Sequence, residues 1–224
     1  MQTISVAIDG PSGAGKSTLA RSIAAKLGYL YVDTGAIYRT IGYYIYTKDI
    51  DPKDEAAVAA RLPEVHVELT YGEDGLQHML LNGRDVTKEI RLPQISMYSS
   101  AVSAHPAVRA FLLEMQQHLA RTNSVIMDGR DIGTVVLPDA DVKIFLTASP
   151  EARAQRRMLE LEQRGTPEPF EVVLKDIQER DWNDSHRAAA PLRQAEDAVL
   201  LDTTELTFAE SEAALLQIIK EKTK

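Results

Sequence analysis

Short runs of apolar residues alternate with segments of helical periodicity along most of the chain. The pattern predicts five buried strands, at residues 3–9, 29–32, 125–127, 142–146 and 198–201. Between and after them, apolar residues recur every three or four positions, which is the spacing of one face of a helix. Short apolar strands separated by helices are typical of a parallel sheet covered on both faces, so we expect an α/β fold.

The interval between the second and third predicted strands is too long for one crossover helix, and its pattern differs. Residues 65–70 alternate apolar and polar side chains, and a second run covers 76–81, with a turn expected at Gly72-Glu73-Asp74-Gly75. Asn82-Gly83 follows, a pair typical of two-residue hairpins. We therefore expect a small antiparallel sheet within residues 62–90, inserted beside the main sheet.

Capping residues locate several helix ends. Gly28 is expected to stop the helix that follows the first strand, and Pro106 to lie near the start of another. Ser149-Pro150 predicts a further helix start, and Gly165-Thr166-Pro167 a break after it. The last helix is expected to open with a capping box at Thr207-Phe208-Ala209-Glu210.

The loop after the first predicted strand carries the most specific motif. It reads Gly10-Pro11-Ser12-Gly13-Ala14-Gly15-Lys16-Ser17-Thr18 and fits G-x-x-x-x-G-K-[ST], the phosphate-binding P-loop. Its glycines let backbone N–H groups surround a polyphosphate, Lys16 adds a positive charge, and Ser17 offers a hydroxyl to Mg²⁺. The strand before the loop and the helix after it are the context that the motif requires, so we expect ATP to bind over residues 10–18.

Composition and charge exclude several classes of protein. The 224 residues suffice for one large domain or a core with insertions, and the absence of cysteine excludes disulfides and thiolate catalysis. A formal net charge of −8 argues against non-specific nucleic-acid binding, so an anionic substrate must be held by local positive charge. No signal peptide or membrane-spanning run is evident, and we expect a cytoplasmic protein with no membrane partner.

Charged residues follow the third predicted strand. Asp128 comes where a carboxylate beside a P-loop can orient Mg²⁺ and its waters, although capping of the next turn is an alternative. Arg130 is placed to hold an acceptor phosphate through a bidentate contact, and a surface ion pair is the alternative. Two roles are open for Asp9: it either contributes to the metal's surroundings or closes the turn after the first strand.

Three arginines share one face of the helix that begins near Pro150. Arg153, Arg156 and Arg157 have the spacing i, i+3, i+4, and the break at 165–167 suits a hinged flap. Such a flap would exclude water and stabilise charge on a transferring phosphoryl group. The alternative is a solvated face, neutralised by carboxylates nearby, namely Glu151, Glu160 and Glu162. Trp182, further along, is expected to be a packing residue.

P-loop proteins include kinases, switch GTPases, motors and passive nucleotide binders. A switch GTPase would need an N-K-x-D run to bind guanine, and this chain has none. The chain resembles the bacterial cytidylate kinase family of nucleoside monophosphate kinases in the runs 8–17, 33–39 (D-T-G-A-I-Y-R), 128–136 (D-G-R-D-I-G-T-V-V), 143–157 and 179–188. It departs from that family's usual pattern at Thr34, where serine is common, and at Ser17, where glycine is common.

The resemblance implies a P-loop kinase fold: a five-stranded parallel core flanked by helices, an inserted monophosphate-binding domain with the small antiparallel sheet, and a helical lid. The boundaries expected from it are 1–36, 110–150 and 169–224 for the core, 37–109 for the insert and 151–168 for the lid. It also implies transfer of the ATP γ-phosphoryl group to CMP or dCMP with Mg²⁺ as cofactor, by a protein that we expect to be monomeric.

The family's site residues carry over position by position. Those implied to bind the acceptor nucleotide are Thr34, Tyr38, Arg39, Ser100, Arg109, Arg130, Asp131, Arg180, Asp184 and Arg187. Those expected to be catalytic are Lys16, Arg130, Arg153 and Arg157. The metal residues Ser17 and Asp128 are expected from this chain's own sequence, since the family commonly has glycine in place of Ser17. The chemistry of cytosine agrees with this set, because its exocyclic amine is a donor for Asp131, whereas uracil has an oxygen there and would leave the carboxylate unpaired. A rival acceptor such as UMP, and a non-catalytic ATP-binding module, remain the alternatives.

Overall fold

The computed structural model describes residues 3–72, 75–163 and 165–223, so Glu73 and Asp74 of the predicted turn lie outside the described residues. The chain divides into two compact units. One comprises residues 1–31 and 120–224, and the other residues 32–119.

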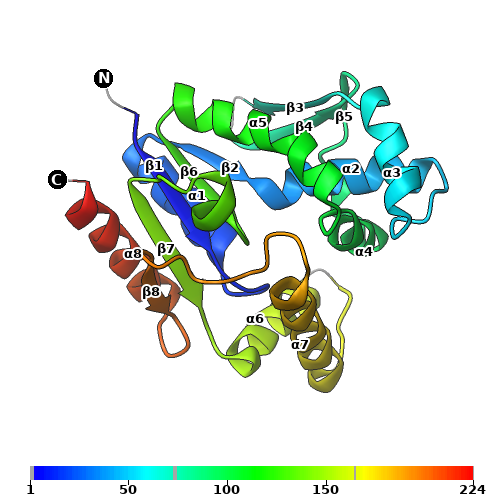
Figure 1. Ribbon diagram of the computed structural model, residues 1–224. Coiled ribbons are helices and arrows are strands. Elements are labelled where there is room, and N and C mark those ends of the chain that lie inside the picture. Colours follow the sequence, from blue (N-terminus) through cyan, green and yellow to red (C-terminus); the bar gives the residue numbers. More distant parts are fainter. Residues whose placement is uncertain (1–2, 73–74, 164, 224) are drawn as a thin grey trace. The chain divides into compact units, whose positions relative to one another are not determined.

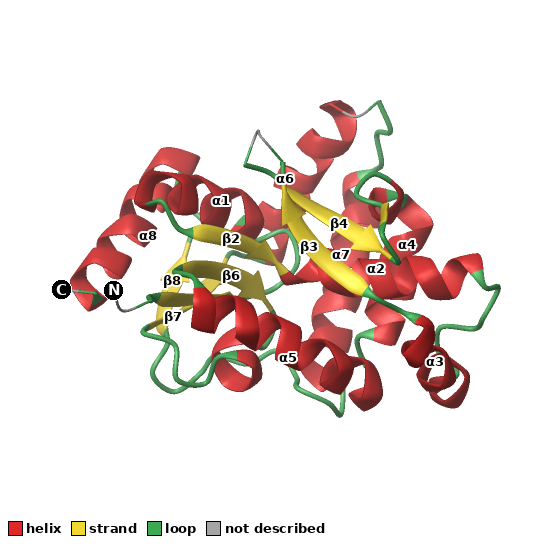
Figure 2. Ribbon diagram, turned by 90° about the horizontal axis from the view of Figure 1, so that it is seen from above, coloured by secondary structure: helices red, strands yellow, loops and turns green. Residues whose placement is uncertain are grey.

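The larger sheet contains all five strands predicted from the apolar runs. They are β1 (Ser5–Asp9), β2 (Leu30–Asp33), β6 (Val125–Gly129), β7 (Val142–Thr147) and β8 (Val199–Asp202). The strand order is β2-β6-β1-β7-β8, and the neighbours β2 and β6 can be followed in Figure 2. β1 runs parallel to both of its neighbours, and β7 runs parallel to β8. The parallel α/β fold is therefore confirmed, and the strand that leads into the P-loop lies in the middle of the sheet.

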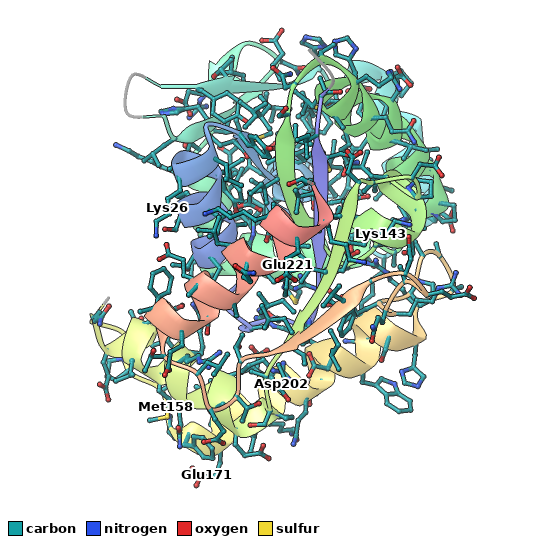
Figure 3. The ribbon with its side chains drawn as sticks, turned by 90° about the vertical axis from the view of Figure 1, so that its left-hand side faces the viewer. Lys26, Lys143, Met158, Glu171, Asp202 and Glu221 are labelled. Atoms are coloured by element: carbon teal, nitrogen blue, oxygen red, sulfur yellow. The ribbon has the colours of Figure 1, made fainter. Side chains whose placement is uncertain are left out.

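Two helices cover one face of this sheet. α1 (Lys16–Leu27) and α8 (Phe208–Lys222) contribute Ile23 and Leu215 to a buried cluster that also holds Val6 and Ile8 of β1. Alternation along β1 sends these two strand residues to the same face. In Figure 3, α8 lies in front of the strands, with α1 beside it. Burial of this cluster anchors the helix that begins inside the P-loop, so the loop has a rigid base.

The predicted helix ends in this unit are largely correct. Gly28 caps α1 in a left-handed conformation, with φ of 69°, and Thr207 forms the expected capping box at the start of α8. α6 (Pro150–Gln163) begins at the predicted proline, and α7 (Phe170–His186) follows the predicted break. α6 and α7 lie side by side (Figure 1), packed through Ala154, Val173 and Ile177.

The prediction that Trp182 packs in the interior is wrong. Its side chain is 64% exposed, and its ring stacks on that of His186, one helical turn later in α7, with 3.6 Å between ring centroids. The apolar face of α7 is instead the one that carries Val173 and Ile177. The sequence shows a tryptophan in a helical segment, but only the tertiary packing decides which face of α7 is buried.

The second unit contains the predicted antiparallel sheet. β3 (Val67–Tyr71), β4 (Gln77–Leu81) and β5 (Arg84–Asp85) pair in that order. Asn82 and Gly83 connect β4 to β5 with φ of 51° and 79°. Both values lie in the left-handed region, as a two-residue hairpin turn of this type requires. The small sheet and its hairpin are thus confirmed.

Helices make up the rest of this unit. They are α2 (Thr34–Thr47), α3 (Glu55–Arg61), η1 (Leu62–Glu64), η2 (Glu89–Arg91), α4 (Pro93–Val102) and most of α5 (Pro106–Thr122). α2 and α4 pack closely at Gly42, where a Cβ atom would lie 2.8 Å from the backbone nitrogen of Ser99. Among the described helices of the whole chain, none is long and apolar enough to cross a membrane.

Candidate active site

The P-loop joins the end of β1 to the start of α1. At Gly10, φ is 152° and a Cβ atom would lie 1.9 Å from the carbonyl oxygen of Leu146, so only glycine fits beside β7. Gly15 caps the start of α1 with φ of 87°. Lys16, the first residue of α1, is buried and its Nζ donates to the carbonyl oxygen of Pro11 at 2.8 Å. The loop therefore folds around its own lysine at a helix N-terminus, which is a favourable place for phosphate.

The protonation of the Lys16 amine depends on opposing effects of its surroundings. Burial and, after it, the nearby Arg130 guanidinium lower the pKa of this amine to about 7, although Asp128, Asp184 and Asp9 act in the opposite direction. A polyphosphate beside the amine would add negative charge and favour its protonated form. The site is thus one in which an anionic ligand completes the charge balance.

Asp128, at the end of β6, is held by two hydroxyl groups. Ser17 donates to its Oδ2 and Tyr31 donates to its Oδ1, each at 2.9 Å, and the carboxylate is buried. A serine hydroxyl and a carboxylate are the hard oxygen donors that suit Mg²⁺. Across residues 3–72, 75–163 and 165–223, no group of three or more His, Cys, Asp or Glu is arranged to hold a metal. The donor set therefore suits an ion that takes its remaining ligands from phosphate and water.

Asp9, at the end of β1, makes its contacts with the backbone. Its Oδ1 accepts from the amide of Ile132 and its Oδ2 from the amide of Gly133, both at 2.7 Å. These amides open the π-helical turn η3 (Ile132–Val136). Burial raises the pKa of Asp9 to about 6, although the two amides lower it. These contacts close the turn after β6, whereas the sequence suggested either the turn after β1 or a place near the metal.

Two cation–carboxylate pairs join the segment after β6 to the end of α7. Nε of Arg130 donates to Oδ2 of Asp184 at 2.7 Å, and Nη2 of Arg187 lies 3.5 Å from Oδ1 of Asp131. All four side chains are mostly buried. Arg180, by contrast, is partly exposed and pairs with Asp176 on its own helix at 3.0 Å. Four of the predicted acceptor residues are thus brought together by the fold of this unit.

The three arginines of α6 have different partners. Arg153 is only 3% exposed, and it donates to both carboxylate oxygens of Asp181 in α7, at 3.1 and 2.6 Å, and to the P-loop carbonyl of Ser12 at 2.9 Å. Arg156 donates to the carbonyl oxygen of Thr203 at 2.5 Å. Arg157 pairs with Glu160 at 2.9 Å, as one of the sequence alternatives proposed. Arg153 therefore ties α6 and α7 directly to the phosphate-binding loop.

The other predicted acceptor residues lie in the second unit, around α2. Asp33 caps this helix by accepting from the amide of Ala36, and Thr34, its first residue, is buried. Nη1 of Arg39 donates to Oγ of Ser96 in α4 at 2.9 Å. Asp33 also accepts from Nη2 of Arg91 at 2.8 Å. The start of α2 is thereby fastened to the segment that precedes α4.

An aromatic–cation contact supports the same region. The guanidinium of Arg109 lies 5.5 Å from the ring centroid of Tyr38, and its Nη1 donates to the carbonyl oxygen of Ser103 at 3.0 Å. Ser100 is exposed on α4. The unit thus holds Thr34, Tyr38, Arg39, Ser100 and Arg109 on α2, α4 and the start of α5.

Comparison with known proteins decides the family. Residues 6–221 match the family model described as cytidylate kinase. The chain belongs to the cytidylate kinase family. A curated cytidylate kinase of Oceanobacillus iheyensis is 49% identical over 218 residues, covering 97% of this chain and 94% of that protein. One of Caldicellulosiruptor bescii is 47% identical over 218 residues, covering 97% and 96%.

These cytidylate kinase relatives confirm the predicted family and the enzyme class, a nucleoside monophosphate kinase, and membership of this kinase family implies the use of ATP. A solved structure of an uncharacterized protein from Eubacterium ventriosum has a TM-score of 0.54 and 12% identity, covering 99% of each chain. That likeness shows a shared fold alone.

Several contacts in this cytidylate kinase fold were not predicted from the sequence. They are Tyr31 with Asp128, Asp181 with Arg153, and Ser96 with Arg39. Tyr31 offers one signal in retrospect, because it is a tyrosine within a buried strand and a buried phenol needs a hydrogen-bond partner. Asp181 and Ser96 lie on ordinary helices, and no local pattern distinguishes them.

Proposed function

We propose that this protein transfers the γ-phosphoryl group of ATP to CMP or dCMP, giving ADP and CDP or dCDP. The observation that carries the proposal is the gathering, within one unit, of the P-loop lysine and the buried pairs Arg130–Asp184 and Arg187–Asp131. A passive nucleotide binder needs a single phosphate site. Arginines at the end of α7 and after β6 supply cations for a second phosphate, in addition to the P-loop.

The reaction joins two anions. A phosphate oxygen of the acceptor forms a bond to the γ-phosphorus, and the bond from that phosphorus to the oxygen bridging to the β-phosphate breaks, releasing ADP. The acceptor oxygen is already a competent nucleophile, so no general base is assigned. Alignment of the two phosphates and neutralisation of their charge are what the protein must supply.

On the donor side, we assign the ATP phosphates to the loop of residues 10–18 and to Lys16. Ser17 and Asp128 would hold Mg²⁺, directly or through water. When bound, this ion would neutralise phosphate charge and orient the phosphoryl group. The protein's own part is to keep Asp128 in position through Tyr31 and to keep the amides at the start of α1 directed at the phosphates.

On the acceptor side, we assign the phosphate to Arg39 and Arg130. A guanidinium presents two parallel N–H groups to phosphate oxygens, which sets both distance and direction. Arg180, Asp184 and Arg187 are assigned to the sugar and phosphate. In the structure, Arg130 and Arg187 each have a carboxylate partner, which keeps the cations in place and compensates their charge before a phosphate binds.

The base is assigned to Thr34, Ser100, Arg109 and Asp131, and Tyr38 is assigned to the acceptor nucleotide. The Asp131 carboxylate accepts from the exocyclic amine of cytosine, and the hydroxyl and guanidinium groups donate to the acceptor atoms of the ring. Uracil presents an oxygen where cytosine has the amine. An unpaired buried group costs about 1–3 kcal/mol, so UMP is expected to be a poor acceptor.

We also propose the division into a core (1–36, 110–150, 169–224), an insert (37–109) and a lid (151–168). Arg153 and Arg157 are assigned to the lid. The contact of Arg153 with the carbonyl of Ser12 supports a direct link between lid and P-loop.

We further propose that the enzyme is monomeric and cytoplasmic and has no nucleic-acid partner. Size-exclusion chromatography with light scattering tests the monomeric state.

The decisive experiment compares initial rates with ATP, Mg²⁺ and each of CMP, dCMP, UMP and AMP in an assay that follows ADP. We expect CMP and dCMP to be the fastest acceptors. A higher kcat/KM with UMP or AMP would overturn the acceptor assignment and favour the rival monophosphate kinase. Tight ATP binding without ADP formation in the presence of any of the four would instead identify a regulatory ATP-binding module.

A further inference from the structure

The π-helical turn η3 starts directly after Arg130 and Asp131, and its first amides are satisfied from outside the turn. An Asp before a helix normally accepts from the first amides with its own carboxylate. Asp131 makes no such capping bond. The amides of Ile132 and Gly133 donate instead to Asp9, a residue 123 and 124 positions away along the chain. The carboxylate that caps this turn therefore belongs to β1.

Because Asp9 supplies the cap, the Asp131 side chain does not cap the turn that it precedes. Its Oδ1 lies 3.5 Å from Nη2 of Arg187. Its backbone carbonyl accepts from the amides of Val135 and Val136, at 2.9 and 3.1 Å, so the main chain of the residue belongs to the turn. If Asp131 capped its own turn, the carboxylate would fold back onto the backbone and could not face the nucleotide base.

The packing around Asp9 fits this role closely. Both carboxylate oxygens are used, and Asp9 is 4% exposed. A Cβ atom at Gly133 would lie 3.4 Å from Oδ2 of Asp9 and 3.2 Å from Cδ of Lys143, the buried lysine of β7 labelled in Figure 3. Asp9 also pairs in the sheet with Gly129, directly before Arg130. The end of β1 thus holds both sides of the segment 130–131.

We infer that Asp9 is a positioning residue for the acceptor nucleotide: by capping η3 in place of Asp131, it sets the orientation of Arg130 and Asp131 toward the monophosphate. The inference rests on the proposed function for the identity of that monophosphate. It assigns Asp9 to the acceptor although the residue precedes the donor-binding P-loop in the sequence. A role toward the metal would change the Mg²⁺ requirement instead of KM for CMP, and a purely structural role would lower only the Tm.

The test uses Asp9→Asn, which replaces one acceptor oxygen by an amino group facing a backbone N–H. We expect KM for CMP to rise roughly tenfold to a hundredfold, because small displacements of aligned groups have large kinetic effects. The ratio of kcat/KM for CMP to that for UMP should also fall, while KM for ATP changes less than about threefold. An unchanged KM for CMP would overturn the inference, whether the variant shows a changed Mg²⁺ requirement or only a lower Tm.

Asp141→Asn is the matched control. Asp141 also binds β1 through its carboxylate, accepting at Oδ2 from the amide and the hydroxyl of Ser5 at 2.7 and 2.9 Å, but at the opposite end of the strand. The same chemical change there is expected to leave both KM values unaltered. Equal effects of the two substitutions on KM for CMP would show that loosening β1 anywhere suffices, and would overturn a specific role of Asp9.

A second variant and a second readout keep the inference testable if Asp9→Asn does not fold. Gly133→Ala places a methyl group against Oδ2 of Asp9 and crowds the side chain of Lys143, and we expect it to raise KM for CMP in the same direction. Hydrogen exchange of peptides covering 130–137 should be faster in either variant than in the wild type. Unchanged exchange would overturn the capping role without any reference to activity, whereas failure of wild-type protein to phosphorylate CMP would overturn the proposed function alone.

Discussion

Arg130 and Asp184 form an ion pair in which Nε of the arginine donates to Oδ2 of the carboxylate at 2.7 Å. The two side chains are 27% and 18% exposed, so the pair is largely removed from solvent. A phosphate that binds Arg130 must either share the guanidinium with Asp184 or replace it. The pair therefore holds the cation in place at moderate cost, because a buried arginine without a partner would be strongly unfavourable.

Replacing Arg130 by methionine is expected to reduce kcat by roughly two to three orders of magnitude, since charge on the transferring group loses a fixed cation. Arg130→Lys should recover only part of the rate, because an ammonium lacks the two-pronged geometry of a guanidinium. Steady-state kinetics with ATP and CMP checks both. Arg61→Met, which removes an exposed arginine paired with Glu64, is the control and should behave as wild type. Near-wild-type turnover by Arg130→Met would contradict the assignment.

Lys16→Met should abolish most activity and yet stabilise the protein at neutral and acidic pH. The pKa of Lys16 is about 7 in the folded protein against an ordinary value of 10.5, so the folded state binds fewer protons between these values. Its contribution to the free energy of unfolding therefore rises with pH from about 7 to 10.5, and the cost of the buried charge is complete below pH 7.

Thermal unfolding at several pH values measures this effect. We expect the Tm of Lys16→Met to exceed that of the wild type by roughly 5 °C at pH 6, and the difference to shrink as the pH rises toward 9. Lys143→Met is the control, because this buried lysine pairs with Asp197 at 2.8 Å and its removal should lower the Tm. A Tm difference for Lys16→Met that is independent of pH would argue against a buried, weakly protonated amine.

Tyr31→Phe removes one of the two hydroxyl groups that hold Asp128. A lost hydrogen bond to a charged group costs about 1.5–3 kcal/mol, so the free energy of unfolding should fall by an amount in this range. We also expect a lower kcat and a higher Mg²⁺ concentration at half-maximal rate, with KM for CMP unchanged. Denaturant titration and a Mg²⁺ series measure these quantities. Tyr29→Phe makes the same change two residues earlier, and identical behaviour of the two variants would speak against a special role for Tyr31.

Asp131→Asn tests how the base is selected. An asparagine can turn its amino group toward the uracil oxygen, so we expect the preference for CMP over UMP in kcat/KM to fall by roughly 10- to 100-fold, the equivalent of one buried unpaired group. Asp184→Asn, which alters a residue assigned to the sugar, should lower both values without changing their ratio. Retention of the full CMP preference by Asp131→Asn would remove this residue from base recognition.

The features predicted correctly from the sequence are those that depend on residues adjacent to one another along the chain. The P-loop, the hairpin at Asn82-Gly83 and the capping box at Thr207 are each set by a few consecutive side chains and their preferred backbone angles. Apolar periodicity located all five core strands within one or two residues of their ends. Here local propensity and global packing agree, so reading the sequence was sufficient.

The contacts within the site were harder to predict. For Arg153 the sequence suggested a place over the transferring phosphoryl group, with neutralisation by nearby carboxylates as the alternative. In the structure it pairs with Asp181 in α7 and also donates to a P-loop carbonyl. Tyr31 and Asp128 are 97 positions apart, but they lie in β2 and β6, which are neighbours in the sheet. The order of strands in a sheet depends on long-range packing, which is absent from the local pattern.

Taken by itself, the sequence determined the fold class, the phosphate-binding loop and the family, because each can be recognised from short runs of residues without knowing which runs meet in space. Tertiary structure alone decided the partners of the charged groups: Asp184 for Arg130, Tyr31 for Asp128, and two backbone amides for Asp9. The physical reason is that a buried charge must find its counterpart wherever the packed chain places one, and strand order brings together residues more than a hundred positions apart.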